Sequence, residues 1–255
     1  MDTHRRIGYC QIPKAACTTW KSVMVKHTKA GRKYSIEKLG LGEFVHSFIK
    51  KVAEIKKENY DFVIPENYTM FMSLRNPFDR LVSTYYNKVF PWKKHNGKMQ
   101  LYYKPIKNWV LKAFPHKILT PYQRQWYNAT FEEFIAYTLS VEDEHWNSLE
   151  IFCEPCRIDY DYILRVETME RDSQVLMSDL YPEEVQLPFT NTKRKRKNNV
   201  SSERIQPKTL DIFSQLSQET LQKLMKKYAW DLEFYGYSFN TTFQAECKFS
   251  ENNCC

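Results

Sequence analysis

Two kinds of apolar pattern alternate along the first third of the chain: short apolar runs, and stretches with helical spacing. Residues 6–12 and residues 68–74 are the short runs, and the second, YTMFMSL, is almost wholly apolar. Such a run is typical of a strand buried in a parallel sheet. After the first run, one helical face carries residues at i, i+3, i+4 and i+7, namely Trp20, Val23, Met24 and His27. The pattern predicts a strand, a loop at residues 13–18 and a helix.

A second helix is predicted directly after the second run. Asn76 is a favourable N-cap, and Pro77 suits the first helical position because an N–H there would have no helical partner. The predicted buried face consists of Leu81, Val82, Tyr85, Tyr86 and Val89. The chain therefore repeats a strand, a loop and a helix, which favours parallel pairing of the two strands.

Further elements are predicted downstream. Residues 35–59 are rich in lysine and predict one or two helices, and the stretch TFEE from Thr130 is a capping box that opens another. Residues 160–168 predict a third strand, followed by a helix that ends near residue 181, and Ser217 caps a helix with one apolar face. Strands that alternate with helices predict an α/β fold with three layers and a mostly parallel central sheet.

One long segment has no clear period. Residues 91–125 are basic and aromatic, and we interpret them as an insertion or substrate loop. A chain of 255 residues is long enough for one sizeable α/β core, so we expect residues 1–255 to form a single domain. No stretch approaches the roughly eighteen apolar residues of a membrane span, and the first six residues lack the apolar core of a signal peptide.

The charge favours an anionic partner. Lys and Arg number 38 against 30 Asp and Glu, which gives a formal net charge of +8. A nucleotide, an acidic polysaccharide, a nucleic acid or a membrane surface would each suit that excess. The run KRKRK at residues 193–197 resembles a nucleic-acid patch in composition, and a site for an acidic glycan or a solvated loop fits equally well. The scarcity of glycine, 6 residues, argues against a disordered chain.

The glycosylation sequons and the cysteines give information on the cellular compartment of the protein. Four N-x-[ST] sequons, at Asn67, Asn128, Asn199 and Asn240, suggest passage through the secretory lumen. The seven cysteines are an odd number, so at least one is free or pairs with another chain if the rest are oxidised. The single Cys-x-x-Cys, formed by Cys153 and Cys156, disfavours zinc; we expect a disulfide, either between these two or with another cysteine.

The loop after the first predicted strand has the composition of an anion site. Backbone N–H groups and the positive end of the helix dipole meet there, Lys14 adds a charge, and Thr18 and Thr19 add hydroxyl donors. The loop lacks the glycines of a Walker A motif, which disfavours a nucleotide kinase. An ordinary strand-to-helix turn is the alternative interpretation.

A second anion site is predicted after the second strand. Arg75 follows that strand and Ser83 lies about two helical turns on, so both can hold one phosphate, the arginine through two N–H groups. Two such sites at strand ends of one sheet suit a nucleotide phosphorylated at both ends. The alternative for Arg75 and Arg80 is a solvated helix face paired with Asp79.

These loops carry a resemblance to a known family. IPKAACTTWK resembles the 5′-phosphosulfate loop, and RNPFDRLVS the 3′-phosphate loop, of sulfotransferases that use 3′-phosphoadenosine 5′-phosphosulfate (PAPS). The blocks at residues 144–176, which contain EHW, CEPC, DYDY and VET, and at residues 230–239 are similar to the Golgi carbohydrate sulfotransferases of the chondroitin 4-O-sulfotransferase and HNK-1 sulfotransferase group. The resemblance covers nearly the whole chain and is weakest over residues 91–125.

The resemblance implies a reaction. It implies transfer of a sulfuryl group from PAPS to a glycan hydroxyl, the 4-hydroxyl of GalNAc in chondroitin or dermatan, with no metal. An HNK-1-type enzyme acting on glucuronic acid and a non-catalytic glycan-binding protein of the same fold are the alternatives. An acidic glycan is the expected partner and a nucleic acid is not. The family resides in the Golgi lumen on an N-terminal membrane anchor, and no anchor is visible in this sequence.

The resemblance also assigns residues. Lys14 would stabilise the leaving oxygen, and the base is expected to be His46, which we favour, or His145. The alternative for His145 is a structural histidine beside Trp146. The full set expected to bind PAPS is Pro13, Lys14, Ala15, Ala16, Cys17, Thr18, Thr19, Arg75, Arg80 and Ser83.

Overall fold

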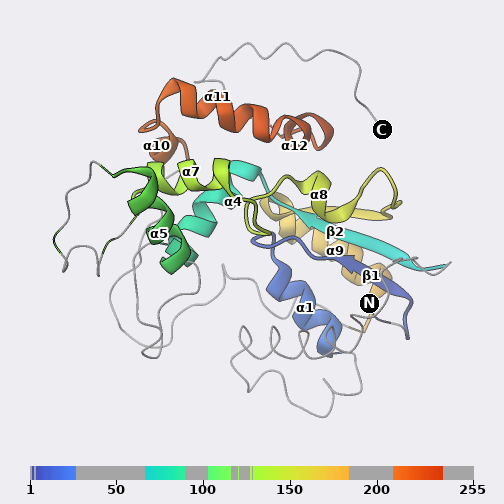
Figure 1. The fold of residues 1–255 in the computed structure, drawn as a ribbon. Coiled ribbons are helices and arrows are strands. Elements are labelled where there is room, and N and C mark those ends of the chain that lie inside the picture. Colours follow the sequence, from blue (N-terminus) through green and yellow to red (C-terminus); the bar gives the residue numbers. More distant parts are fainter. Residues whose placement is uncertain are drawn as a thin grey trace. The chain divides into compact units, whose positions relative to one another are not determined.

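Figure 1 shows the fold in a computed structural model of the chain, which describes residues 2, 4–26, 67–89, 103–115, 120, 127, 129–183 and 209–237. The chain divides into two compact units. The first comprises Met1–Arg75 and Cys153–Ser201, and the second Asn76–Phe152 and Ser202–Cys255. The single domain expected from the sequence stays a prediction.

The first unit contains a parallel sheet. Its strands are β1 (Ile7–Cys10), β2 (Thr69–Leu74) and β3 (Tyr162–Arg165), in the spatial order β1-β2-β3 (Figure 1). Both pairings are parallel, so long connections must link the strands. The predicted α/β class and parallel sheet are confirmed. The third strand ends earlier than predicted, because residues Val166–Thr168 form a 3-10 turn.

Two helices cover one face of this sheet. They are α1 (Cys17–Lys26) and α9 (Met169–Leu180). The apolar cluster between them and the strands consists of Ile7, Trp20, Val23, Phe71, Leu164, Leu176, Met177 and Tyr181. The ring of Trp20 meets that of Phe71 edge-on, with centroids 5.2 Å apart. Packing of α1 against the strands therefore fixes the helix that begins at the end of the loop after β1.

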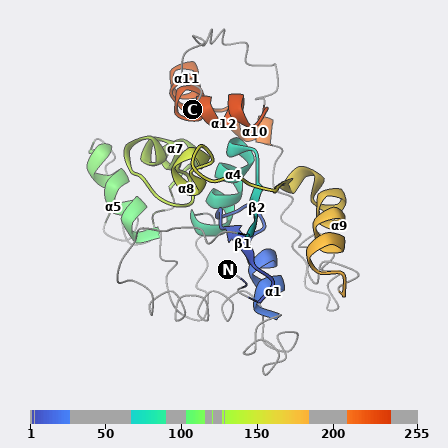
Figure 2. The same ribbon diagram turned by 90° about the vertical axis from the view of Figure 1, so that its right-hand side faces the viewer.

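The second unit is helical. Its elements are α4 (Pro77–Thr84), the π-helical turn η2 (Tyr85–Val89), α5 (Tyr103–Ala113), α7 (Phe131–Ser140), α8 (Leu149–Cys153, whose last residue belongs to the first unit), α10 (Thr209–Phe213), α11 (Gln218–Lys227) and α12 (Ala229–Phe234). Helix α7 packs against both α5 and α11 (Figure 2). The core combines aliphatic and aromatic residues, and Phe78 meets Phe213 edge-on at 5.4 Å between centroids.

The three helix caps expected from the sequence are confirmed. The side chain of Asn76 accepts from Phe78 N at 3.0 Å, with Pro77 at the first helical position. Thr130 and Glu133 form both halves of the capping box of α7. The Ser217 hydroxyl accepts from Thr220 N at 3.2 Å at the start of α11. Local polar chemistry therefore sets where these helices begin.

One prediction needs correction. Part of the segment at residues 91–125, expected to lack regular structure, forms helix α5, whose Ile106 and Val110 are buried one turn apart. Two buried residues among lysines form too short a stripe to reveal a period in the sequence. The rest of that segment apart from residues 114, 115 and 120, and the predicted helices at residues 35–59, lie outside the described residues. Within the described part of the chain, no helix is both long and apolar enough to cross a bilayer.

Candidate active site

The loop between β1 and α1 has an unusual backbone. Lys14 and Ala16 both adopt left-handed conformations, with φ of 68° and 59°. Such a conformation costs about 1–2 kcal/mol at each non-glycine residue, so the surroundings must hold it. Thr19 N and Trp20 N donate to the Ala16 carbonyl at 3.0 and 3.3 Å, which joins the loop to the first turn of α1. Backbones that alternate between left- and right-handed residues build concave anion sites from N–H groups.

Residues at the carboxyl end of β2 and on β1 support this loop from the sheet. Ser73 Oγ donates to the Ala15 carbonyl, and the Tyr9 hydroxyl lies 3.1 Å from Ser73 Oγ. Arg75 Nη1 donates to the Lys14 carbonyl at 3.3 Å. Burial raises the pKa of Tyr9, so its hydroxyl stays protonated. The consecutive carbonyls of Lys14 and Ala15 thus accept hydrogen bonds from residues at the carboxyl end of β2.

The structure brings most of the predicted 5′-phosphosulfate residues together. Residues 13–19 form one continuous loop and helix start, and α1 begins at Cys17. Pro13 and Ala15 are buried and shape the loop, whereas Lys14, Thr18 and Thr19 are half-buried. The cation and the hydroxyls therefore lie at a helix N-terminus, where the dipole favours an anion.

A disulfide secures the approach to this loop. Cys10, the last residue of β1, is bonded to Cys153, with their Cα atoms 5.9 Å apart. Cys156 is also disulfide-bonded, and Cys17 is a free thiol. The preference for a disulfide over zinc is confirmed for both residues of the CEPC motif, and Cys153 pairs with Cys10 rather than with Cys156.

Arg75 and Arg80 differ sharply in their surroundings. Arg75 is half-buried beside the loop, whereas the side chain of Arg80 is fully buried in the second unit. Arg80 Nη2 donates to the Asn147 carbonyl, and Asp79 accepts instead from Thr209 Oγ1. The alternative interpretation of Arg80, an exposed arginine paired with Asp79, is wrong. We do not retain Arg80 among the nucleotide ligands, because its guanidinium is buried against the protein's own backbone.

The other predicted residues are distributed as follows. Ser83 is half-buried on α4, in the second unit, and His145 lies in the same unit on the loop that follows α7. His46 and the basic run at residues 193–197 lie outside the described residues.

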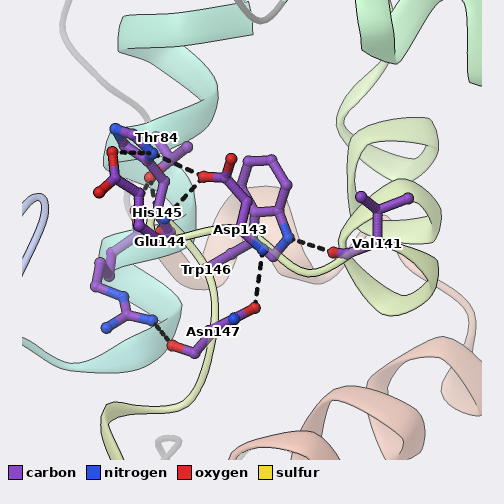
Figure 3. A network of polar contacts seen from close by, with 8 residues as sticks. Thr84, Val141, Asp143, Glu144, His145, Trp146 and Asn147 are labelled. Carbon is purple, nitrogen blue, oxygen red and sulfur yellow. Dashed lines mark hydrogen bonds and ion pairs between the residues drawn. The ribbon is translucent and has the colours of Figure 1, made fainter. Parts of the chain in front are cut away.

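The loop around His145 is a dense polar network (Figure 3). Asp143 Oδ1 lies 2.8 Å from His145 Nδ1 and accepts from His145 N at 2.9 Å. Asn147 Oδ1 accepts from Asp143 N at 2.9 Å, and Trp146 Nε1 donates to the Val141 carbonyl at 2.6 Å. The carboxylate of Asp143 therefore fixes both the backbone and the ring of His145.

Three consecutive carbonyls of this loop accept hydrogen bonds from side chains of the second unit. Thr84 Oγ1 shares its proton between the carbonyl of Arg80, at 2.9 Å, and the carbonyl of His145, at 3.3 Å. Tyr228 OH donates to the carbonyl of Trp146 at 2.6 Å. As described above, Arg80 donates to the third, the carbonyl of Asn147. Buried carbonyls need such partners, and here each comes from a helix or helix end. The loop is consequently held at successive residues.

A buried carboxylate completes this support. Asp231 Oδ1 accepts from Ser148 Oγ at 2.6 Å and from Leu149 N at 2.8 Å. Burial raises the pKa of Asp231, and the hydrogen bond from Ser148 and the charge of Arg80 oppose that rise. Two features of the sequence are weak signals of these supports: Ser73 is a lone serine inside an apolar strand, and Asp231 lies between Trp230 and Leu232.

The histidine itself is held in a mostly dry site. Its side chain is 9% exposed. Burial lowers the pKa of His145, and the hydrogen bond and charge of Asp143 raise it in opposition. Lys88 lowers this pKa further, and Glu144, with Oε1 3.8 Å from Nδ1, raises it. The ring is therefore neutral at pH 7, and a neutral imidazole can accept a proton.

Comparisons with known proteins agree with the motifs. Carbohydrate sulfotransferase 11 of Mus musculus is 29% identical over 93% of this chain and 66% of its own length. Carbohydrate sulfotransferase 8 of Mus musculus is 28% identical over 93% of the chain and 56% of its own length. Carbohydrate sulfotransferase 14 of Danio rerio is 25% identical over 97% of the chain and 64% of its own length. The chain thus spans less than two thirds of the length of these relatives.

The family assignment rests on a match that covers most of the chain. No solved structure matches the chain. The family described as "Sulfotransferase family" matches residues 1–238, which include both phosphate-loop motifs and the His145 loop. On that match, the chain belongs to the sulfotransferase family.

Proposed function

We propose that this protein is a carbohydrate sulfotransferase that moves a sulfuryl group from PAPS to a glycan hydroxyl. The observation that carries the proposal is the loop after β1, where two left-handed residues, Lys14 and Ala16, lie at the N-terminus of α1. A strained loop that its neighbours hold in place is a sign of function. Membership of the sulfotransferase family supports PAPS as the anion for which the loop is built.

The chemistry follows from what the loop supplies. An acceptor oxygen attacks sulfur in line, and negative charge builds on the 5′-phosphate oxygen that leaves. Lys14 stabilises that oxygen, and N–H groups of residues 15–19 with the hydroxyls of Thr18 and Thr19 hold the 5′-phosphate. The contacts of Ser73 and Arg75 to loop carbonyls support this role, because they fix the loop before the nucleotide arrives.

We propose that Arg75 and Ser83 bind the 3′-phosphate. Arg75 is half-buried and can present two parallel N–H groups to a phosphate while it contacts the loop. Ser83 is half-buried and can donate its hydroxyl. The two residues are tested separately, by the nucleotide affinity of Arg75→Ala and of Ser83→Ala.

The base that takes the acceptor's proton is His46 or His145. His46 remains a prediction from sequence. His145 has support from its surroundings, since its ring is neutral and bonded to Asp143.

We propose chondroitin or dermatan, sulfated at the GalNAc 4-hydroxyl, as the acceptor. The names of the relatives specify carbohydrate, and the net charge of +8 suits an acidic polysaccharide. We propose the Golgi lumen as the compartment. The Cys10–Cys153 disulfide and the exposed sequon asparagine Asn67 support an oxidising, glycosylating lumen.

The decisive experiment is transfer of radiolabelled sulfate from PAPS to a panel of acceptors. Desulfated chondroitin, dermatan, heparosan and a glucuronyl-lactosamine should be compared, with Lys14→Ala as the matched inactive control. We expect label on chondroitin or dermatan. Label on the glucuronyl acceptor alone would indicate the HNK-1-type reaction. Tight binding of the adenosine bisphosphate product without transfer to any acceptor would favour the non-catalytic glycan-binding protein.

A further inference from the structure

The contact between Asp143 and His145 has a chemical consequence for the second nitrogen of the ring. An ionised carboxylate only accepts hydrogen bonds, so the nitrogen that contacts it must carry the proton. At 2.8 Å, Asp143 Oδ1 therefore keeps the proton of the neutral ring on Nδ1. The lone pair is then on Nε2, at the far side of the ring.

We propose that Asp143 is a positioning residue, which holds His145 in the tautomer whose Nε2 accepts the proton of the acceptor hydroxyl. This inference rests on the function proposed above. As the acceptor oxygen forms its bond to sulfur, its proton passes to Nε2. The bond between sulfur and the 5′-phosphate oxygen breaks, and adenosine bisphosphate leaves with the electron pair.

The same carboxylate oxygen also accepts from the backbone N–H of His145, at 2.9 Å. Asp143 thereby ties the ring to its own main chain, and the ring cannot turn without losing a charged hydrogen bond. Asn147 Oδ1 in turn accepts from the N–H of Asp143 at 2.9 Å, which orients the residue that carries the carboxylate. The arrangement is more than a surface contact between neighbours in sequence.

The helices extend this control to the main chain. Thr84, Tyr228 and Arg80 donate to the carbonyls of residues 145, 146 and 147 in succession. A loop held at each residue keeps its ring within the narrow range of positions that proton transfer requires.

The charged groups that act on the ring predict the pH dependence. They are Asp143 and Glu144 on its own loop and Lys88 on η2. Because the neutral ring is the active form, kcat rises with pH through the pKa of His145 and then levels off. Burial holds that pKa below its ordinary value of 6.5, so the rise in kcat lies at lower pH than it would for a free imidazole.

The test compares Asp143→Asn with Glu144→Gln. Both remove one negative charge near the ring, but only Asp143 makes the hydrogen bond to Nδ1. The amide of an asparagine can donate to Nδ1 and favour the wrong tautomer. We expect Asp143→Asn to lower kcat by about 10²-fold or more with KM for PAPS little changed, and to move the rising limb to lower pH. Glu144→Gln should keep kcat close to that of the wild type.

A second measurement does not depend on turnover. Nitrogen-15 NMR of the ring, assigned with His145→Gln, should show at pH 7 a proton on Nδ1 and none on Nε2. In Asp143→Asn the proton should shift toward Nε2, while Glu144→Gln should match the wild type. An Nε2-protonated or doubly protonated ring in the wild type overturns the inference.

The kinetic outcomes separate this inference from the proposed function. If the wild type transfers sulfate and Asp143→Asn or His145→Gln is equally fast, the positioning role is wrong and the sulfotransferase assignment stands. If the wild type transfers no sulfate to any acceptor, the proposed function fails, and the role of Asp143 fails with it.

Discussion

At the scale of single residues, Lys14 is the side chain on which the proposed chemistry most depends. Lys14→Ala should lower kcat by about 10²–10³-fold, as does the loss of one donor to a developing oxyanion. Affinity for adenosine bisphosphate should change much less, because the backbone of the loop remains. Single-turnover transfer and calorimetry measure the two effects. Lys26→Ala, which removes the same charge from the last turn of α1, is the control, and equal rates for the two variants would remove Lys14 from the reaction.

Ser73 tests whether the loop conformation needs its support from the sheet. Ser73→Ala leaves the buried Ala15 carbonyl without this donor, so the free energy of unfolding should fall by about 1–3 kcal/mol. Nucleotide affinity should fall as the loop relaxes. Tyr9→Phe removes only the hydroxyl next to Ser73 and leaves the contact to Ala15, so its effect should be smaller. Urea unfolding and calorimetry compare the two, and a larger effect of Tyr9→Phe would contradict this account.

At the scale of elements, sequence and structure agree where local chemistry decides. The apolar run of β2, the cap at Asn76 and the capping box at Thr130 were all predictable, because a few neighbouring residues determine each. Helix α5 was not, since its burial depends on packing against α7. The left-handed loop residue Ala16 likewise has no signal in its residue type.

The candidate site likewise has parts that were predictable from local sequence and parts that were not. Lys14 and the first turn of α1 were predictable, because strand, loop and helix follow each other in the chain. The supports of the site come from distant positions: Ser73 is 58 residues from Ala15, and Tyr228 is 82 residues from Trp146. The burial of Arg80 was not predictable for the same reason, since its partner Asn147 lies 67 residues away. Only the fold brings such pairs together.

The cap of α7 gives a test at the scale of one helix. Thr130→Ala removes the oxygen that accepts from Glu133 N, and should lower the free energy of unfolding by about 1 kcal/mol. Thr130→Ser keeps the cap and should preserve stability. Ser140→Ala, at the last residue of α7, is the matched control with an expected change within about 0.5 kcal/mol. Urea unfolding measures all three, and equal stability of Thr130→Ala and wild type would show that the cap is dispensable.

Helix α7 also connects to the candidate base. The rings of Phe134 and Tyr137 lie 5.9 and 5.6 Å from that of Trp146, next to His145. These contacts bury the residue that follows the histidine and add to the polar support of its carbonyl. In the sequence EHW, the ring of Trp146 thus packs against α7, and the backbone carbonyls accept hydrogen bonds from α4 and Tyr228.

At the scale of the whole molecule, the two loops that carry the candidate functional residues are positioned in different ways. The first unit places a charged loop at the end of a parallel sheet, and the second holds a histidine loop among helices. The family match at residues 1–238 spans sequence from both units. The first unit is itself assembled from two distant stretches of chain, so its stability depends on links between them.

The Cys10–Cys153 disulfide is one such link, between residues 143 positions apart. A crosslink across so long a segment restricts the unfolded chain strongly, so Cys10→Ser/Cys153→Ser should lower the free energy of unfolding by about 2–5 kcal/mol. Because Cys10 ends the strand that leads into the Lys14 loop, nucleotide affinity should fall as well. Cys17→Ser, which removes a free thiol and leaves the disulfide intact, is the control for stability and should keep the free energy of unfolding. Urea unfolding with and without reductant measures the effect: reduction should destabilise the wild type more than the double variant. If reduction destabilises both proteins equally, the stabilising bond is a different one.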